Sequence, residues 1–347
     1  MINVRSFGKT KEGIEAQLFI LDNGYLSVYI TDFGGHIVSI NVPDKNGVLT
    51  DFVLGADDVD AYAGNIDYMG ATIGRFANRI EKGKFVLNDK EYTLAVINGP
   101  NHLHGGIDGF NHKMFDAYVD NDTLRLSYDS PDGEEGYPGN LSFSVSFTLN
   151  NDNSLDIEYN AVCDKDTVVN FTNHAYFNLN GAISDKKIYN HYLYLNSEAF
   201  CRGDVDCLAD GTVVPVRNTD MDFRKPALLG ERLNSKYEDI CMTGGIDHNF
   251  VLDMKKGDYK KAAELYCKDS GIKMECYTDQ PGIQIYTGNV TDYKNGKFST
   301  YYGKHCAICL ETQTFPNSTS FSYFPSPILK KDEKFYSKTT YKFSVDK

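Results

Sequence analysis

The chain has 347 residues, of which 41% are hydrophobic and 24% charged, proportions that are ordinary for a soluble globular protein with a sizeable core. Its 48 Asp and Glu outnumber its 35 Lys and Arg, and the resulting net charge of −13 repels phosphate backbones and anionic membranes. This excludes nucleic acid and lipid as expected partners. The many Tyr and Phe residues favour strands over helices.

The N-terminal segment lacks the apolar run of a signal peptide, and no later stretch is long and apolar enough to span a bilayer, so we expect a cytoplasmic protein. Segments 24–30 and 141–149 alternate apolar with small or polar residues, the two-residue period of half-buried strands. Turn signals recur at short intervals, at 22–24, 44–47, 150–153 and 294–296. We therefore expect an all-β protein, a large antiparallel β-sandwich or barrel. Without repeats or linkers, it reads as one domain over residues 1–347.

Three polar clusters rich in glycine carry groups capable of chemistry. Segment 70–80 places two arginines four residues apart, segment 98–106 holds two histidines two residues apart, and segment 244–249 contains an aspartate and a histidine. His-x-His with a carboxylate is compatible with a metal centre, whereas Arg near Asp is equally a structural ion pair. No single spacing decides between these interpretations.

Segment 169–179 reads as a strand with one apolar face, interrupted only by Asn173. Its other face is polar and is formed by Asn170, Thr172, His174, Tyr176 and Asn178. Considered alone, such a face is most simply interpreted as exposed to solvent, with a histidine that has no special role. A face of amides, hydroxyls and an imidazole without any charge is nevertheless unusual for an exposed surface and is typical of a sugar-binding one.

Little helix is expected. A short helical piece is predicted within 226–233. Segment 260–267 has helical propensity, but the turn at 268–271 and the strand-like segment 272–277 favour a β-hairpin instead.

A second predicted strand, 305–313, places Ala307, Cys309, Glu311 and Gln313 on one face. The Glu311 carboxylate therefore lies beside small apolar side chains, and a partly buried carboxylate is costly unless paired. This makes Glu311 a candidate catalytic base. Considered alone, a solvated or ion-paired glutamate at a strand end is the simpler interpretation.

The eight cysteines are expected to be buried free thiols, because the chain is long and shows no dense cysteine framework. The one Cys-x-x-Cys, Cys306 to Cys309, lies in the predicted strand, where residues three apart point to opposite faces. No second such pair exists to complete a zinc site.

Seven segments in order resemble the aldose 1-epimerase (galactose mutarotase) family, and each is moderately specific by itself. They are 74–80 (GRFANRI), 101–106 (NHLHGG), 135–139 (EGYPG), 173–179 (NHAYFNL), 245–248 (GIDH), 281–289 (PGIQIYTGN) and 310–316 (LETQTFP). Together they are very specific and span nearly the whole chain. The departures are small, such as Ala175 where the family often has Ser and Thr314 where it often has Asn. The resemblance implies a galactose mutarotase-like supersandwich, a single β-sandwich domain with its sugar site on one sheet.

By motif, the resemblance implies that Glu311 is the catalytic base and His174 the catalytic acid. It implies that His104 binds the sugar and assists the acid, and that the sugar hydroxyls are contacted by Asn78, Arg79, Asp247 and Gln284. The implied reaction interconverts the α and β anomers of free hexoses such as galactose and glucose, through acid–base opening and closure of the ring. It involves neither redox change nor hydrolysis, so we expect no metal and no other cofactor.

Two rival functions are weighed against this one. A hexose-6-phosphate mutarotase on the same fold would need cations for the phosphate, yet the implied site holds one cation, Arg79, and two anions. Arg75 is a possible second cation or a partner of a structural acid. A non-catalytic sugar-binding protein would lack the acid or the base, and a glycosidase with two carboxylates would leave His174 idle. The expected partner is a small-molecule sugar, bound by a monomer or homodimer.

Overall fold

The computed structural model describes residues 2–64, 66–255 and 257–346. Strands are the main regular structure of these residues, and the helices are three short α-helices, namely α1 (Val59–Ala63), α2 (Leu229–Leu233) and α3 (Glu238–Thr243). No helix within the described ranges is long and apolar enough to cross a membrane. The fold is an antiparallel β-sandwich, as the alternation of apolar residues and the spacing of turns predicted.

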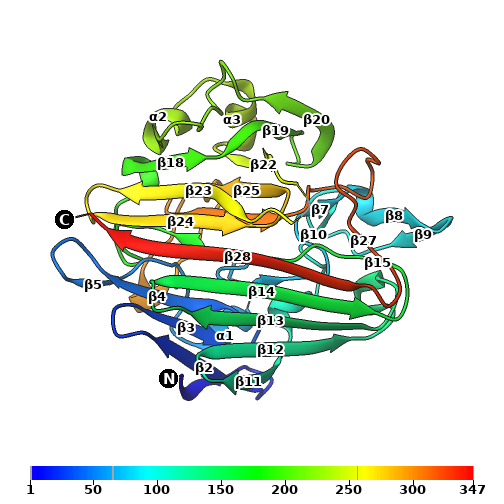
Figure 1. The fold of residues 1–347 in the computed structure, drawn as a ribbon, viewed down its shortest axis with the longest axis horizontal. Coiled ribbons are helices and arrows are strands. Elements are labelled where there is room, and N and C mark those ends of the chain that lie inside the picture. The colour runs from blue at the N-terminus through cyan, green and yellow to red at the C-terminus, as the bar shows by residue number, and fades with distance from the viewer. Residues whose placement is uncertain (1, 65, 256, 347) are drawn as a thin grey trace.

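A nine-stranded antiparallel sheet forms one layer and faces the viewer in Figure 1. Its order is β11 (Asp116–Asp120), β12 (Thr123–Ser130), β13 (Leu141–Leu149), β14 (Ser154–Cys163), β28 (Lys334–Val345), β24 (Ile272–Thr278), β23 (Lys260–Cys267), β18 (His191–Leu195) and β21 (Ala227–Leu228). The C-terminal strand β28 lies at the centre of this sheet. It joins a meander of earlier strands on one side to the β23–β24 hairpin on the other.

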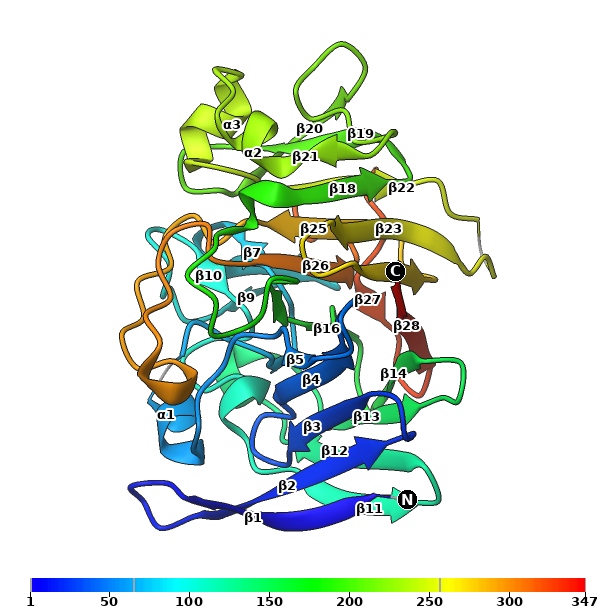
Figure 2. The same cartoon turned by 90° about the vertical axis from the view of Figure 1, so that its left-hand side faces the viewer.

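The second layer contains two sheets, which lie behind the first in Figure 1 and beside it in Figure 2. The six-stranded sheet runs β17 (Tyr176–Phe177), β26 (Ile308–Gln313), β25 (Gly282–Tyr286), β22 (Asp247–Leu252), β19 (Ser197–Gly203) and β20 (Ala209–Pro215). The five-stranded sheet runs β1 (Asn3–Lys9), β2 (Glu15–Asp22), β3 (Ser27–Thr31), β4 (Ile37–Pro43) and β5 (Leu49–Asp51). A bridge between Val53 and Phe177 connects the two sheets.

Short two-stranded ladders and 3-10 turns complete the described structure. The ladders pair β6 (Thr72–Ile73) with β16 (Thr172–Asn173), β7 (Arg79–Ile80) with β10 (His102–Leu103), β8 (Lys84–Leu87) with β9 (Lys90–Thr93), and β15 (Thr167–Val168) with β27 (Ile328–Leu329). The 3-10 turns are η1 (Glu81–Gly83), η2 (Phe110–His112), η3 (Glu134–Gly136), η4 (Ile188–Asn190) and η5 (Lys297–Ser299).

The main core lies between the layers and explains why the alternating segments become strands. Phe143, Val145 and Phe147 of β13 enter it from the nine-stranded sheet, and Ile308 and Leu310 of β26 enter it from the six-stranded sheet. Each such side chain, once fully buried, contributes roughly 1.5–3 kcal/mol of hydrophobic free energy. Because alternate residues of β26 are thereby directed inward, the remaining ones must point away from the main core.

Most strand predictions are confirmed. The segment 141–149 is β13, the strand predicted at 24–30 is β3, and the hairpin expected at 260–277 is β23–β24. The helix expected within 226–233 is α2, but α1 and α3 were not predicted. Each of these two missed helices is no longer than six residues, too short for an apolar stripe to repeat along it.

The single strand predicted over 169–179 is wrong. The chain pairs with β6 at β16 and with β26 at β17, and His174 lies between these two short strands. There the His174 backbone N–H donates to the Ala71 carbonyl, and the Gly70 N–H donates to the His174 carbonyl. The polar face is buried instead of solvated. Apolar and polar residues alternate along the whole segment, but its backbone pairs first with β6 and then with β26.

All eight cysteines, each of them a described residue, are free thiols, as predicted. The expectation that they are buried holds for five of them, namely Cys163, Cys201, Cys267, Cys276 and Cys309. It is wrong for Cys241, which is exposed, and for Cys207 and Cys306, which are partly exposed.

Candidate active site

Three neighbouring strands of the six-stranded sheet place polar side chains on one side of the site. We call Asp247, Gln284 and Glu311 the strand wall; they come from β22, β25 and β26. Gln284 pairs directly with Glu311 across β25 and β26, so the sheet register holds these two side chains on the same face. The Gln284 side-chain Nε2 donates to Asp247 Oδ1 over 2.6 Å.

The opposite side of the site is formed by Asn78, Arg79 and His104, which we call the loop wall. Asn78 and His104 flank the β7–β10 ladder, and both have left-handed backbone, with φ of 65° and 48°. Both asparagine and histidine adopt this conformation more often than most other non-glycine residues. The next two residues after His104 are glycines with positive φ, which complete the turn.

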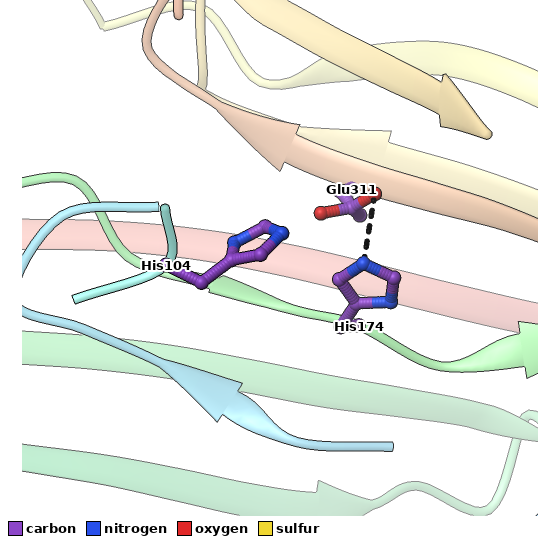
Figure 3. A group of neighbouring side chains, drawn as sticks. All are labelled: His104, His174 and Glu311. Carbon is purple, nitrogen blue, oxygen red and sulfur yellow. Dashed lines mark ion pairs between the residues drawn. The ribbon is translucent and has the colours of Figure 1, made fainter. Parts of the chain in front are cut away.

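Two reciprocal hydrogen bonds hold the loop wall together and fix the protonation of His104. The His104 backbone N–H donates to the Asn78 carbonyl, and the Asn78 backbone N–H donates to His104 Nδ1, each over 3.1 Å. Since Nδ1 accepts a hydrogen bond from an amide, the proton of the neutral imidazole must be on Nε2. In Figure 3 this ring points toward His174 and Glu311, so His104 offers the site an N–H donor.

Arg79 connects the two walls. Its Nε donates to Asn98 Oδ1 over 2.8 Å, and its Nη1 lies 3.7 Å from Asp247 Oδ2 on the strand wall. Nη1 also donates to the Cys207 carbonyl over 3.4 Å. The Arg79 and Asp247 side chains are only 11% and 12% exposed, so this ion pair is shielded from solvent far more than an ordinary surface pair.

His174 lies against the strand wall, with each ring nitrogen facing one side chain of β26. Its Nε2 is 3.6 Å from Glu311 Oε1, as the dashed line in Figure 3 marks, and its Nδ1 is 3.6 Å from Cys309 Sγ. The ring stacks on Tyr176 with a centroid distance of 5.0 Å, and it meets the His104 ring edge-on at 5.1 Å. These contacts confine the imidazole on both faces and at both nitrogens.

Burial controls the electrostatics of the acid–base pair. Desolvation and the nearby Asp247 raise the pKa of Glu311 well above its usual range, although Arg79 opposes the shift. Desolvation lowers the pKa of His174 to about 4, and it lowers the pKa of His104 well below the usual value. Burial therefore favours the neutral form of each group, the protonated carboxyl of Glu311 and the uncharged imidazole of His174.

His104, His174 and Glu311 present possible ligand atoms that all lie within 4.8 Å of one another, an arrangement that raises the question of a metal. The donor set does not suit one. A metal at His104 Nε2 would displace its proton to Nδ1, where the Asn78 N–H already points. Two N–H groups would then face each other, so this histidine is poorly prepared to bind a metal.

The seven residues implied by the family motifs come together through this chain of contacts. Sequence reasoning missed Asn98, which holds Arg79, Cys309, which faces His174, and Tyr68, whose ring lies 4.8 Å from that of His104. The periodicity of β26 places Cys309 beside Glu311 and could have identified it. The loop contacts of Asn98 and Tyr68 carry no such signal.

Of the polar face predicted in 169–179, only His174 joins the acid–base group. Asn170 instead donates to the Ala77 carbonyl, and Asn178 donates to the carbonyls of Lys186 and Cys306. Asn173, the exception on the apolar face, donates to the Gly70 carbonyl. Buried amides commonly satisfy backbone groups in this way. Asn170 and Asn178 therefore serve the backbone, and sugar binding by the rest of this face stays a prediction.

Comparisons with known proteins identify the family. The family model described as aldose 1-epimerase matches residues 17–342. The chain is 40% identical to the galactose mutarotase of Sus scrofa, covering 98% of this chain and 97% of the relative, and 31% identical to the aldose 1-epimerase of Escherichia coli K12, covering 95% of each. An aldose epimerase homologue from C. elegans superposes with a TM-score of 0.87 at 26% identity, covering both chains completely. A galactose 1-epimerase from Lactobacillus acidophilus gives a TM-score of 0.86 at 26% identity, covering 100% of this chain and 99% of that one. The chain therefore belongs to the aldose 1-epimerase family.

Proposed function

We propose that this chain interconverts the α and β anomers of a free hexose such as galactose or glucose, with Glu311 as base and His174 as acid. Membership of the family supports an isomerase. The observation that carries the residue assignment is the buried pair of Glu311 and His174, whose facing atoms are 3.6 Å apart. The two oxygens that exchange protons in this reaction are bonded to the same sugar carbon, so their base and acid must lie side by side.

The reaction opens and recloses a hemiacetal. Glu311 takes the proton of the C1 hydroxyl, His174 Nε2 gives a proton to the ring oxygen, and the bond between C1 and the ring oxygen breaks to leave an aldehyde. Rotation about C1–C2 presents the other face of the carbonyl. On closure, His174 recovers its proton from the hydroxyl and Glu311 returns one to the carbonyl oxygen, so the enzyme ends as it began.

Because burial favours the neutral carboxyl and the neutral imidazole, the bound sugar must favour the carboxylate form of Glu311 before the ring opens. Glu311 Oε2 is buried and has no hydrogen-bond partner among the described residues, so it is open to a sugar hydroxyl. A hydroxyl that donates there stabilises the carboxylate form, and Arg79 lowers the pKa of the same group. Sugar binding thus shifts the proton to His174 and prepares both groups.

The remaining residues suit a neutral sugar. Gln284 Oε1 is buried without a hydrogen-bond partner in the described structure, so it can accept from a hydroxyl, and His104 Nε2–H can donate to a sugar oxygen. The Asn78 side-chain oxygen already accepts the Arg79 backbone N–H, which leaves its amide nitrogen for the sugar. Asp247, fixed by Gln284 and Arg79, accepts from further hydroxyls.

The same geometry argues against the alternatives. A phosphate substrate calls for more than one cation, but Arg75 is buried and donates to Ser130 and to the Pro138 carbonyl, so it cannot serve as the second. In a glycosidase Asp247 would be the second carboxylate, yet it is engaged by Gln284 and Arg79. A binding-only protein would not need a buried acid–base pair.

Polarimetry tests the proposal directly. Freshly dissolved α-D-galactose and α-D-glucose should equilibrate faster with the protein than without it, and glucose 6-phosphate should be converted far less efficiently in the same buffer and salt. A clear preference for the phosphate would favour the sugar-phosphate enzyme, and the absence of acceleration with tight sugar binding would favour the binding protein.

We also infer a single domain over the chain and a cytoplasmic location. One core cluster draws residues from all three large sheets, which supports one folding unit. Eight free thiols suit a reducing compartment. The net charge of −13 disfavours nucleic acid and anionic lipid as partners and leaves a small sugar as the ligand. Sedimentation or light scattering would distinguish the monomer from the homodimer.

A further inference from the structure

The proposed reaction makes a specific demand on the tautomer of His174. Nε2 must carry a proton before the ring opens and be bare afterwards, so that it can take the proton back. The second nitrogen, Nδ1, must therefore hold its own proton in both states. A neutral imidazole with its proton on Nε2 would have no free lone pair toward the sugar and could not complete the cycle. Something at Nδ1 has to select the correct form.

The group found at Nδ1 is the Cys309 thiol, with Sγ at 3.6 Å. Cys309 and Glu311 alternate on β26, so one strand face presents a partner to each nitrogen of the same ring. Both Cys309 and His174 are buried, at 0% and 5% exposure, so water does not compete for Nδ1. Burial raises the pKa of the Cys309 thiol well above its usual range, which keeps this partner neutral.

From this geometry we infer that Cys309 is a positioning residue of the proposed reaction: its sulfur accepts a hydrogen bond from His174 Nδ1–H and thereby keeps Nε2 available for proton exchange. This inference rests on the proposed function. A thiol can donate or accept, and with Nε2 turned to the Glu311 carboxyl group the sulfur is the acceptor at Nδ1. Because sulfur is a weak acceptor, it does not make the imidazole much more basic. A carboxylate in its place would stabilise the imidazolium and weaken it as an acid.

The thiol has one helper at Nδ1. The backbone carbonyl of His174 itself also accepts from the imidazole and raises its pKa, so it favours the same Nδ1–H form. The titratable or charged side chains that face or influence the ring from the surrounding elements are Glu311 on β26, Tyr176 on β17, Tyr286 on β25, Asp247 on β22, Arg79 on β7, His104 after β10, and Tyr68 before β6. Of the two ring nitrogens, Nε2 faces the Glu311 carboxyl group and Nδ1 faces the thiol.

The two histidines of the site thus have opposite protonation patterns. A backbone N–H at Nδ1 forces the proton of His104 onto Nε2, which makes that residue a permanent donor. A sulfur at Nδ1 holds the proton of His174 there, which leaves Nε2 able both to give and to take. The difference explains why His174, and not His104, suits the role of acid.

Nitrogen-15 NMR of the imidazoles tests the tautomer without relying on activity. In the resting wild-type enzyme near neutral pH, the His174 resonances, assigned by their loss in His174→Asn, should report a neutral ring protonated at Nδ1. In Cys309→Ala they should shift toward the Nε2–H form. A wild-type His174 ring protonated at Nε2 would overturn the inference even if the enzyme is fully active.

Kinetics give a second test with a matched control. Cys309→Ala should lower kcat by about 10-fold with little change in KM, while Cys309→Ser, which keeps an acceptor, should recover most of the rate. The hydroxyl is a stronger acceptor, so it should raise the pKa of His174 and move the loss of kcat/KM at low pH to higher pH. Cys306→Ala removes a thiol three residues away and should change neither. A normal rate and pH profile in Cys309→Ala would refute the role of the thiol, whereas a wild-type protein without mutarotase activity would refute the proposed function instead.

Discussion

The strand wall and the loop wall reach the same site by different physical means. Glu311 and Gln284 owe their positions to the register of adjacent strands, which a long ladder of backbone hydrogen bonds maintains. Asn78 and His104 owe theirs to left-handed residues and two reciprocal hydrogen bonds across a two-pair ladder. The difference teaches that the base Glu311 is placed by the register of long strands, whereas the donor His104 is placed by local turn contacts. Substitution of Glu311 should lower turnover, whereas substitution of His104 should mainly weaken sugar binding.

The largest effect is expected for Glu311→Gln. Loss of a general base costs about 10²–10⁴-fold in rate, and the neutral amide has nearly the same shape, so the fold should persist. Because the Glu311 side chain is buried with its Oε2 unpartnered, its replacement by an amide of nearly the same shape should not lower thermal stability. Polarimetry and thermal unfolding measure the two effects. The matched control is Glu158→Gln on the outer side of β14, and near-normal turnover of Glu311→Gln would remove this residue from the role of base.

A loss of comparable size, also in kcat, is expected for His174→Asn. The imidazole is confined by Tyr176 and by β26, so its replacement removes the acid without freeing the backbone that Ala71 holds. The rate should fall by about 10²–10⁴-fold at saturating sugar, with KM changed much less. Initial rates over a range of galactose concentrations separate the two parameters. A variant whose defect disappears at high sugar concentration would show that His174 binds substrate without transferring a proton.

His104→Asn is expected to affect the kinetics differently from His174→Asn. His104 is held as an Nε2–H donor, so its loss should mainly raise KM, and kcat should fall less than in His174→Asn. Its substitution also removes the acceptor for the Asn78 N–H, which should loosen the loop wall. The same kinetic series supplies the measurement. If His104→Asn loses more turnover at saturating sugar than His174→Asn does, the two roles should be exchanged.

The two walls also differ in how far the sequence could predict them. The position of Glu311 on the strand wall was predictable because β26 alternates apolar and functional residues with a period of two. This period alone places Glu311 on the same face as Cys309. The contacts of the loop wall were not predictable, since nothing in the local sequence indicates that the Asn78 N–H donates to His104 Nδ1. Segment 169–179 shows the limit of periodicity itself. Its faces alternate as expected, yet two short strands with different partners replace the single strand, because pairing depends on distant residues such as those of β6.

The pH dependence of kcat/KM tests whether one shared proton operates in the site. His174, with its pKa lowered to about 4, gains a proton only below that pH, and the pair is then doubly protonated and has no base. Glu311, with its pKa raised, loses its proton only well above the ordinary carboxyl range, and the pair then has no acid. The profile should fall near pH 4 on the acid side, and its other limb should fall well above the ordinary carboxyl range. Circular dichroism at each pH checks that the fold survives. A single ionisation near pH ~6.5 would indicate an ordinary histidine and contradict the shared proton.

The smallest effect is expected from metal removal, and the loop wall explains why. Two histidines and a glutamate within 4.8 Å resemble a metal centre, but the set depends on His104 Nε2 losing its proton. If that proton moved to Nδ1, two donors would face each other in place of the Asn78 hydrogen bond. A metal could therefore bind His104 only by disrupting the turn that positions this histidine. Dialysis against a strong chelator should therefore leave the mutarotation rate unchanged, and added divalent ions should not increase it. A rate that falls on dialysis and returns with one particular ion would show that the loop wall rearranges to bind a metal, and the acid–base assignment would then have to include it.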